Sequence, residues 1–297
     1  MRLQQWRDAG QGYRHHGHTI FYRDTGNAHS ESALLLIHGF PTSSWDWHKV
    51  WEPLCTKFPR VIAPDMIGFG YSSKPADYPY SIFDQADLHE QLLKQLGVKR
   101  IHLLAHDYGD TVAQELLARH EDRLAKNDSN LTIESCVFLN GGLFPETHRA
   151  RLIQRMLLTP LGPLLSRLMN RRGFGKSFSA VFGPNTQPST VELDEFWTLM
   201  HHNQGQRLAH RLIRYIPERK ANRERWVGVL QKTKIPLRVI NGPEDPVSGQ
   251  HMVDRYRELV PNPDTVTLPG IGHYPQVEDA PGVLSAFLDF HRRIAAA

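Results

Sequence analysis

Short apolar runs rich in β-branched residues alternate along the chain with stretches of helical periodicity, and this alternation constrains the fold more than any other feature. It predicts an α/β architecture in which a mostly parallel sheet is covered on both faces by helices. Since ligands of open α/β sheets bind at the carboxyl ends of the strands, functional residues are expected in the loops that follow them. The predicted buried strands are residues 33–37, 60–63, 101–105, 133–139, 236–240 and 265–268.

The alternation breaks between residues 142 and 228, where the sequence becomes rich in Arg, Leu and Met, has a helical period and is punctuated by prolines. We expect an all-helical insertion between two strands of the sheet. It divides the chain into a first part of the core at residues 1–141, the insertion at 142–228 and a second part of the core at 229–297. Upstream, residues 81–96 predict an amphipathic helix with Ser81 at its N-cap.

The apolar run at residues 101–105 passes into a sharp turn and then into the helical pattern at 112–118. A strand, a tight turn and a helix form a nucleophile elbow, which raises one side chain above the sheet at a helix N-terminus. Here that side chain is Asp107, and the free N–H groups of the first helical turn stabilise a carboxylate at this place. The alternative is that Asp107 only caps the helix, since Asp is a preferred N-cap residue.

Residues after three other strands are predicted to surround this elbow. An HGFP loop follows the first buried strand, and the backbone N–H groups of Phe40 and Tyr108 are predicted to form an oxyanion hole. Asp245 follows the strand at 236–240, and His273 lies in a glycine-rich loop after the last strand. The chain order Asp107, Asp245, His273 is the order of nucleophile, acid and histidine in one type of catalytic triad.

Composition restricts the cellular setting. The 297 residues are 40% hydrophobic and 22% charged, and no apolar run approaches the ~18 residues of a membrane span. The polar N-terminal residues lack the apolar stretch of a secretory signal, so a cytoplasmic location is expected. The charge of +4 is spread over 35 basic and 31 acidic residues, which predicts no nucleic-acid partner. Cys55 and Cys136 lie among apolar neighbours and are predicted to be core thiols.

In combination, these motifs resemble α/β-hydrolases of the aspartate-nucleophile branch, which contains the epoxide hydrolases and the haloalkane dehalogenases. The resemblance rests on the HGFP loop, the HDYG motif around Asp107, Asp245 and the Gly-His pair at His273, which span nearly the whole chain. Residues 140–148 further resemble the mesoderm-specific transcript group of hydrolase-like proteins, a likeness that implies no particular substrate. The resemblance implies an eight-stranded, mostly parallel sheet and a helical cap that roofs the active site.

The resemblance also implies a two-step mechanism that uses neither a cofactor nor a metal. A carboxylate is a poor acyl nucleophile, but it displaces a leaving group from a saturated carbon and gives an alkyl ester, here of Asp107. His273, oriented by Asp245, then activates a water that attacks the ester carbonyl. The oxyanion hole stabilises the charge of this second step.

The leaving group separates the enzyme hypotheses. An epoxide leaves as an alkoxide and needs a proton donor, and Tyr215 stands where the cap of epoxide hydrolases carries a ring-opening tyrosine. We therefore expect an epoxide hydrolase that produces a vicinal diol. Haloalkane dehalogenases generally place Asn or Trp where Phe40 stands and Trp where Tyr108 stands, in order to bind the halide. This chain has neither residue there, so a dehalogenase-type hydrolase is the alternative and not the leading hypothesis. A non-catalytic binding protein with the same fold is the alternative from another class.

The chain departs from the epoxide hydrolase pattern, because the insertion contains no second tyrosine. His148, His201 or His202 could replace it, since an imidazole donates the same hydrogen bond. Together with His38 and Trp45, His148 is predicted to contact the substrate. The expected partner is a small, mostly apolar organic molecule, and a homodimer is left open.

Overall fold

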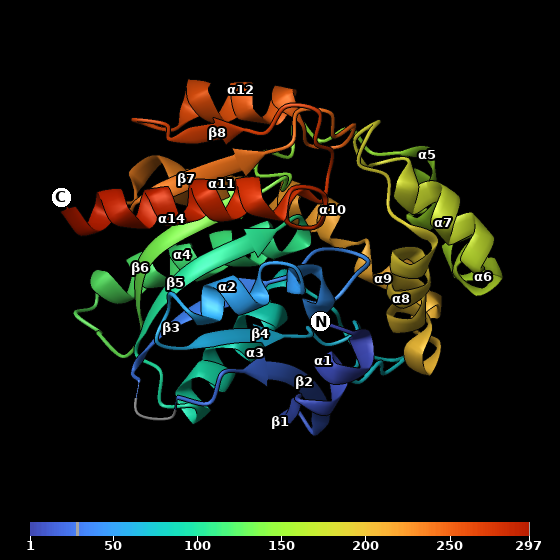
Figure 1. Ribbon diagram of the computed structural model, residues 1–297, viewed down its shortest axis with the longest axis horizontal. Coiled ribbons are helices and arrows are strands. Elements are labelled where there is room, and N and C mark those ends of the chain that lie inside the picture. The colour runs from blue at the N-terminus through green and yellow to red at the C-terminus, as the bar shows by residue number, and fades with distance from the viewer. Residues whose placement is uncertain (28–29, 297) are drawn as a thin grey trace.

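A computed structural model describes residues 1–27 and 30–296 and contains a single eight-stranded sheet (Figure 1). The strand order is β1-β2-β4-β3-β5-β6-β7-β8, and the pairs from β4 to β8 are parallel. All six predicted strands are present, with ends that agree to within one residue, so the predicted α/β architecture is confirmed. The strands are β1 (Gln11–His15), β2 (His18–Asp24), β3 (Ser32–Ile37), β4 (Val61–Pro64), β5 (Arg100–His106), β6 (Thr132–Leu139), β7 (Leu237–Asn241) and β8 (Thr265–Thr267).

The first two strands were not among the predicted buried runs, because they form an antiparallel edge with many polar side chains. β1 pairs with β2, and β2 pairs with β4, in antiparallel fashion. His16 and Gly17 form the two-residue turn between them and have positive φ values of 46° and 79°. Such a turn matches the twist of a hairpin. Central strands are continuous apolar runs and are easy to recognise in a sequence. A half-exposed hairpin mixes polar and apolar residues and is harder to recognise.

Helices cover both faces of the sheet. In Figure 1, α14 and α2 lie in front of the sheet, whereas α3 and α4 lie behind it. The predicted cap of α3 is confirmed, since the Asp84 N–H donates to Ser81 Oγ at 3.1 Å. These core helices are α1 (Leu3–Asp8), α2 (Trp51–Cys55), α3 (Ile82–Gln95), α4 (Tyr108–Leu124), α12 (Gln250–Leu259), α13 (Pro275–Glu278) and α14 (Ala280–Ala296), with a 3-10 segment η1 (Ser44–Trp47).

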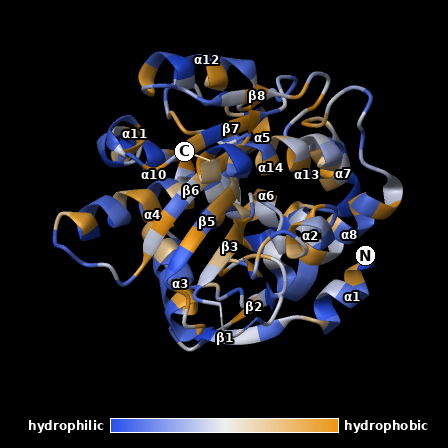
Figure 2. Ribbon diagram, turned by 60° about the vertical axis from the view of Figure 1, so that its left-hand side comes forward, coloured by the Kyte–Doolittle hydropathy of each residue, from blue (hydrophilic) through white to orange (hydrophobic). Residues whose placement is uncertain are grey.

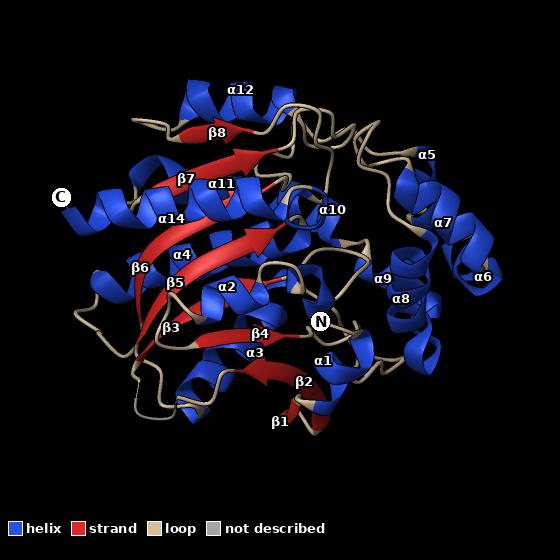
Figure 3. Ribbon diagram, in the orientation of Figure 1, coloured by secondary structure: helices blue, strands red, loops and turns tan. Residues whose placement is uncertain are grey.

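The segment between β6 and β7 contains helices and no strand among its residues, all of which the structure describes. Its first five helices lie beyond the carboxyl ends of the strands, at the right of Figures 1 and 3. The segment therefore lies over the edge where the strand-end loops meet. Its helices are α5 (Leu152–Leu157), α6 (Gly162–Leu168), α7 (Arg171–Ser179), α8 (Thr190–His201), α9 (Ala209–Leu212), α10 (Tyr215–Ala221) and α11 (Arg223–Lys232), with a 3-10 segment η2 (His202–Leu208).

The core lies on both faces of the central strands, and the ribbons of β3 and β5 are largely orange, that is hydrophobic, in Figure 2. Leu34 to Ile37 on β3 and Leu103 to Ala105 on β5 are fully buried. Strands buried on both faces need continuous apolar runs, which explains why the sequence revealed them. Among the described residues, none of the helices has both the length and the apolar composition needed to cross a bilayer.

The close approach of α4 to β3 predicts the effect of adding one methyl group. A Cβ at Gly109 would lie 2.3 Å from the Ile37 carbonyl oxygen and 2.7 Å from that of His38. We expect Gly109→Ala to lower the free energy of unfolding by about 3 kcal/mol, because neither backbone can yield easily. A denaturant titration measures this change.

Gly228 is the matched control, since it lies inside α11 with no atom within 4 Å of an added Cβ. Gly228→Ala is expected to raise the free energy of unfolding by about 0.5–1 kcal/mol through helix propensity alone. Equal effects of the two substitutions would contradict the proposed contact between α4 and β3.

Candidate active site

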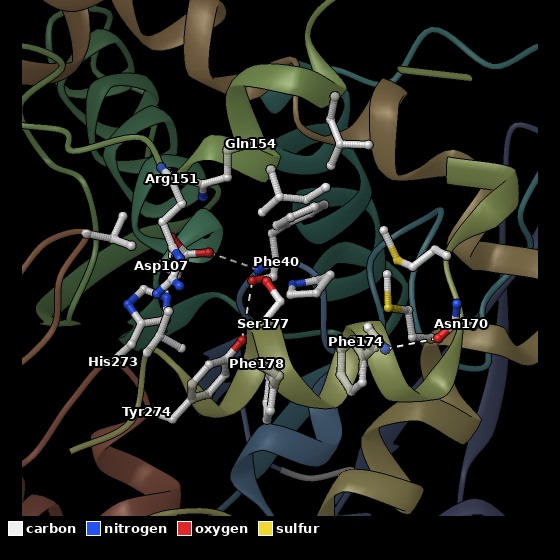
Figure 4. A pocket seen from close by; sticks show the side chains of 18 of the residues that line it. Phe40, Asp107, Arg151, Gln154, Asn170, Phe174, Ser177, Phe178, His273 and Tyr274 are labelled. Atoms are coloured by element: carbon white, nitrogen blue, oxygen red, sulfur yellow. Dashed lines mark hydrogen bonds and ion pairs between the residues drawn. The ribbon is translucent and has the colours of Figure 1, made fainter. Parts of the chain in front are cut away.

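Asp107 occupies a sharp turn between the end of β5 and the start of α4. Its backbone has φ 51° and ψ −108°, a conformation that is costly for a residue with a side chain and that is found at functional turns. Its side chain forms no capping hydrogen bond to α4, so capping does not explain the carboxylate. Instead the carboxylate points into a pocket (Figure 4).

The loop after β3 supplies a hydrogen-bond donor to this carboxylate. The Phe40 backbone N–H donates to Asp107 Oδ2 at 3.0 Å. Tyr108 is the first residue of α4, so its N–H has no acceptor within the helix. The loop after β3 thus supplies one of the two N–H groups that the sequence proposed as an oxyanion hole, and the other belongs to the residue that follows Asp107 in the chain.

His273 lies between two carboxylates. Its Nδ1 is 2.7 Å from Asp245 Oδ2, and its Nε2 is 3.9 Å from Asp107 Oδ1. The first distance is that of a charge-assisted hydrogen bond, whereas the second exceeds hydrogen-bonding range. The structure therefore brings the three residues proposed as a triad into one buried cluster.

Asp245 is held in place by three further hydrogen bonds. The Val247 N–H donates to Oδ1 at 2.7 Å, and Asn140 Nδ2 and Ser248 Oγ contact Oδ2 at 3.0 and 2.8 Å. Asn140, at the end of β6, was missed by the sequence reasoning. Its position in the sequence could have revealed it. Asn140 is a polar residue directly after a buried strand, as His38 is, and such positions face the ligand edge of an α/β sheet.

The electrostatics of the cluster favour an ion pair. Burial lowers the pKa of His273, but the Asp245 and Asp107 carboxylates outweigh it and raise this pKa to about 9. Burial raises the pKa of Asp245, but the charge of His273 and its hydrogen bonds outweigh it and lower this pKa to about 2. At neutral pH a protonated imidazole therefore lies between two carboxylates.

The pocket above Asp107 has a volume of about 340 Å³ and lies between the sheet loops and the inserted helices (Figure 4). Its lining is mostly apolar, with Arg151, Gln154, Asn170 and Ser177 as polar additions from the insertion. Such a pocket suits an apolar molecule with few polar groups. Its remaining lining residues are Phe40, Pro41, Asp107, Ile153, Leu157, Leu168, Met169, Gly173, Phe174, Phe178, Val181, Met200, Val247, His273 and Tyr274.

Tyr215 lies at the start of α10 beside the elbow and is buried. Its ring is 4.8 Å from the Tyr108 ring and 6.2 Å from the Phe40 ring, and the Arg219 guanidinium lies 4.8 Å from its centroid. Burial and then the charge of Asp107 raise its pKa, so the hydroxyl stays protonated. Tyr215 is not among the residues that line the pocket. The sequence alone predicts that its hydroxyl faces the substrate.

Tyr274 was missed by the sequence reasoning, which looked for hydroxyl donors only in the insertion. It follows His273 directly and lines the pocket, and its hydroxyl donates to the Phe40 carbonyl at 3.4 Å (Figure 4). Burial raises its pKa well above the ordinary value. The long distance of this hydrogen bond leaves the hydroxyl available to another acceptor.

Two predicted substrate contacts lie outside the pocket lining. His38 is fully buried, and its Nε2 accepts the Met66 N–H at 3.0 Å, so it joins two loops instead of facing the substrate. The Trp45 indole stacks on His48 at 4.2 Å and is buried in the core. Proximity in sequence to the HGFP loop did not reveal which way these rings point.

His148 also lies outside the pocket lining. Its Nδ1 accepts a hydrogen bond from Arg219 Nη2 at 3.2 Å, which holds the ring beside Arg219. Burial lowers the pKa of His148 to about 3, so the ring is neutral. His201 lies against Trp197, and His202 lies against Tyr71. No histidine of the insertion therefore lines the described pocket, and the expected replacement of the second tyrosine by one of them is corrected.

Comparison with known proteins gives concordant matches. Residues 34–286 match the model of the alpha/beta hydrolase family. The mesoderm-specific transcript protein of Mus musculus is 44% identical over 295 residues, which cover 97% of this chain and 87% of that protein. A haloalkane dehalogenase from Agrobacterium tumefaciens C58 has a TM-score of 0.80 at 20% identity, covering 97% of this chain and 98% of its own. An epoxide hydrolase has a TM-score of 0.74 at 20% identity, covering 96% and 99%.

The charge pairing predicts a pH window for stability. The raised His273 pKa stabilises the fold fully below pH 6.5, and this contribution is lost as the pH rises through about 9. The lowered Asp245 pKa stabilises the fold fully above pH 3.8, and this contribution is lost as the pH falls through about 2. Both contributions are complete between these limits, from pH 3.8 to 6.5.

NMR titration of the His273 ring proton tests this pairing. We expect a midpoint near pH 9 in the parent chain and a lower one in Asp245→Asn, because burial then acts against one carboxylate instead of two. Asp289→Asn, which alters a carboxylate on α14 bound to Arg238, is the control and should leave the midpoint unchanged. An equal midpoint in the parent and Asp245→Asn would contradict the pairing.

Proposed function

The chain belongs to the alpha/beta hydrolase family, and we propose that it hydrolyses its substrate through an alkyl ester of Asp107. The observation that carries the proposal is the setting of this carboxylate. The Phe40 N–H binds one carboxylate oxygen at 3.0 Å, and His273 Nε2 lies 3.9 Å from the other. An aspartate at the elbow, with an apolar pocket above it, suits displacement at a saturated carbon better than acyl transfer.

In the first step, Asp107 Oδ1 attacks a saturated carbon of the substrate. The Phe40 N–H holds Oδ2, which leaves Oδ1 as the attacking oxygen. A carbon–oxygen bond forms to Asp107, and the bond from that carbon to the leaving group breaks with its electron pair. The fixed orientation of the carboxylate lowers the entropic part of the barrier.

In the second step, His273 activates water. Esterification removes the negative charge of Asp107, which is one of the charges that raise the His273 pKa. The imidazole then loses its Nε2 proton more readily and can act as a base, with Asp245 holding the ring. Nε2 takes a proton from the water as the water oxygen bonds to the Asp107 carboxyl carbon, and the N–H groups of Phe40 and Tyr108 stabilise the oxyanion. The bond from this carbon to the ester oxygen then breaks, the alcohol leaves with the proton returned by Nε2, and Asp107 is a carboxylate again.

We further propose that the substrate is an epoxide and that the product is a vicinal diol. An opening epoxide carries an alkoxide, so the site must supply a proton. Tyr274 offers a hydroxyl at the pocket wall, and Tyr215 offers one beside Asp107. Both pKa values are raised, which keeps the hydroxyls protonated until the alkoxide forms.

Trapping the ester tests the proposed function. In His273→Gln, incubated with a panel of epoxides, we expect intact-protein mass spectra to show an added mass equal to the whole epoxide, because the base for the second step is absent. The adduct should be lost when Asp107→Asn is added. His148→Gln, which removes a partly buried histidine outside the pocket, is the control and should accumulate no adduct.

The same experiment with bromoalkanes separates the alternatives. An added alkyl group without bromine would assign a dehalogenase-type hydrolase and overturn the epoxide proposal. Full turnover in Asp107→Asn would overturn the aspartate mechanism itself. A chain that binds the panel without forming any adduct or product would favour the non-catalytic alternative.

The two tyrosines can be tested by removing their hydroxyls. We expect Tyr274→Phe and Tyr215→Phe each to slow ester formation from an epoxide by about 10²-fold, the usual scale for losing a general acid. Rapid-quench measurement of the ester in the His273→Gln background gives this rate. Tyr256→Phe removes a buried hydroxyl that has no hydrogen-bond partner among the described residues, and it should change nothing. Normal rates in both active-site variants would contradict the proton-donor role.

A further inference from the structure

Five leucines on and between α5 and α6 expose their side chains. Their exposed fractions are 67% for Leu152, 36% for Leu158, 61% for Leu161, 54% for Leu164 and 65% for Leu168. Leu161, Leu164 and Leu168 follow helical spacing, so they share one side of α6. We call Leu161, Leu164 and Leu168 the leucine face. Contiguous exposed apolar side chains mark interaction surfaces, whereas scattered ones do not.

The segment that carries the leucine face has an extreme charge balance. Residues 147–191 contain seven Arg or Lys residues and no Asp or Glu, so the rest of the chain is net acidic. Arg171 pairs with Asp194 at 2.6 Å. The exposed cations of this segment with no carboxylate within 4 Å, among the residues that the structure describes, are Arg149, Arg155, Arg167, Arg172 and Lys176.

The leucine face continues into the pocket. Leu168 belongs to the leucine face and also lines the pocket. The next two residues, Met169 and Asn170, line the pocket as well. From α5, Arg151 and Leu157 line the same pocket. The helices α5, α6 and α7 form the outer edge of the molecule, away from the sheet (Figure 1). A surface pressed against this edge would therefore meet the rim of the pocket.

We propose that the leucine face docks the protein on an anionic lipid bilayer. The leucine side chains enter the boundary between headgroups and acyl chains, and the unpaired arginines and Lys176 contact lipid phosphates. A second copy of the chain fits the leucine face less well than an anionic bilayer does. A symmetric dimer would place the same unpaired cations of the two copies against each other. The pocket rim then faces the bilayer, and apolar substrates enter from it.

Co-sedimentation of the full chain with vesicles tests this docking and needs no catalysis. We expect binding to vesicles of phosphatidylcholine with 30 mol% phosphatidylglycerol, and at least about tenfold weaker binding to pure phosphatidylcholine, since each surface cation adds to the attraction. Salt near 1 M, where the Debye length is about 3 Å, should weaken the anionic preference.

Substitutions in the leucine face and among its cations assign the surface. Leu164→Glu with Leu168→Glu should reduce binding at least about tenfold, because two charges would have to enter the apolar boundary. Leu124→Glu, at an equally exposed leucine on α4, is the control and should bind normally. The triple change Arg155→Gln, Arg167→Gln and Arg172→Gln should abolish the anionic preference, whereas Lys57→Gln, Lys94→Gln and Lys126→Gln should preserve it.

Thermal denaturation tests whether each variant is folded. All the altered side chains are exposed, so we expect each variant to keep the melting temperature of the parent chain. Absence of vesicle binding by the parent chain would overturn the proposal. A dimer in sedimentation equilibrium that Leu164→Glu dissociates, without lipid binding by either form, would assign the leucine face to a second copy instead.

Discussion

The turn between β5 and α4 is the constraint on which the site depends. Gly109 lets the start of α4 lie against the carbonyl groups of Ile37 and His38, where an added Cβ would lie only 2.3 Å from a backbone oxygen. This contact holds the helix N-terminus beside the loop after β3, so that Asp107 at φ 51° meets the Phe40 N–H. Backbone packing therefore positions the Asp107 carboxylate.

The charges at this turn depend on one another. Asp107 and Asp245 together raise the pKa of His273 to about 9, although burial acts in the opposite direction. Under the proposed mechanism, ester formation removes the Asp107 charge and so lowers the pKa of His273. The imidazole then loses its proton more readily and can act as the base of the second step. In that proposed mechanism, the same carboxylate serves as the nucleophile and also influences the protonation of His273.

The sequence predicted the central strands, the elbow and the proposed triad, because each follows from local order along the chain. Buried strands are continuous apolar runs, and Asp107, Asp245 and His273 directly follow such strands or their loops. The direction of individual rings was not predictable. His38 and Trp45 are near the site in sequence, but packing turns them into the core. Tyr274 and the leucine face depend on how the insertion lies over the sheet, which no local pattern encodes.

A single turnover in water enriched in ¹⁸O tests the central claim, that water attacks the carboxyl carbon of Asp107 and not the substrate. With enzyme in excess over substrate, we expect ¹⁸O in the Asp107 carboxylate, found by mass spectrometry of the peptide that contains it, and unlabelled product. Label in the product, with none in the Asp107 peptide, would show that water attacks the substrate directly and would contradict the ester mechanism.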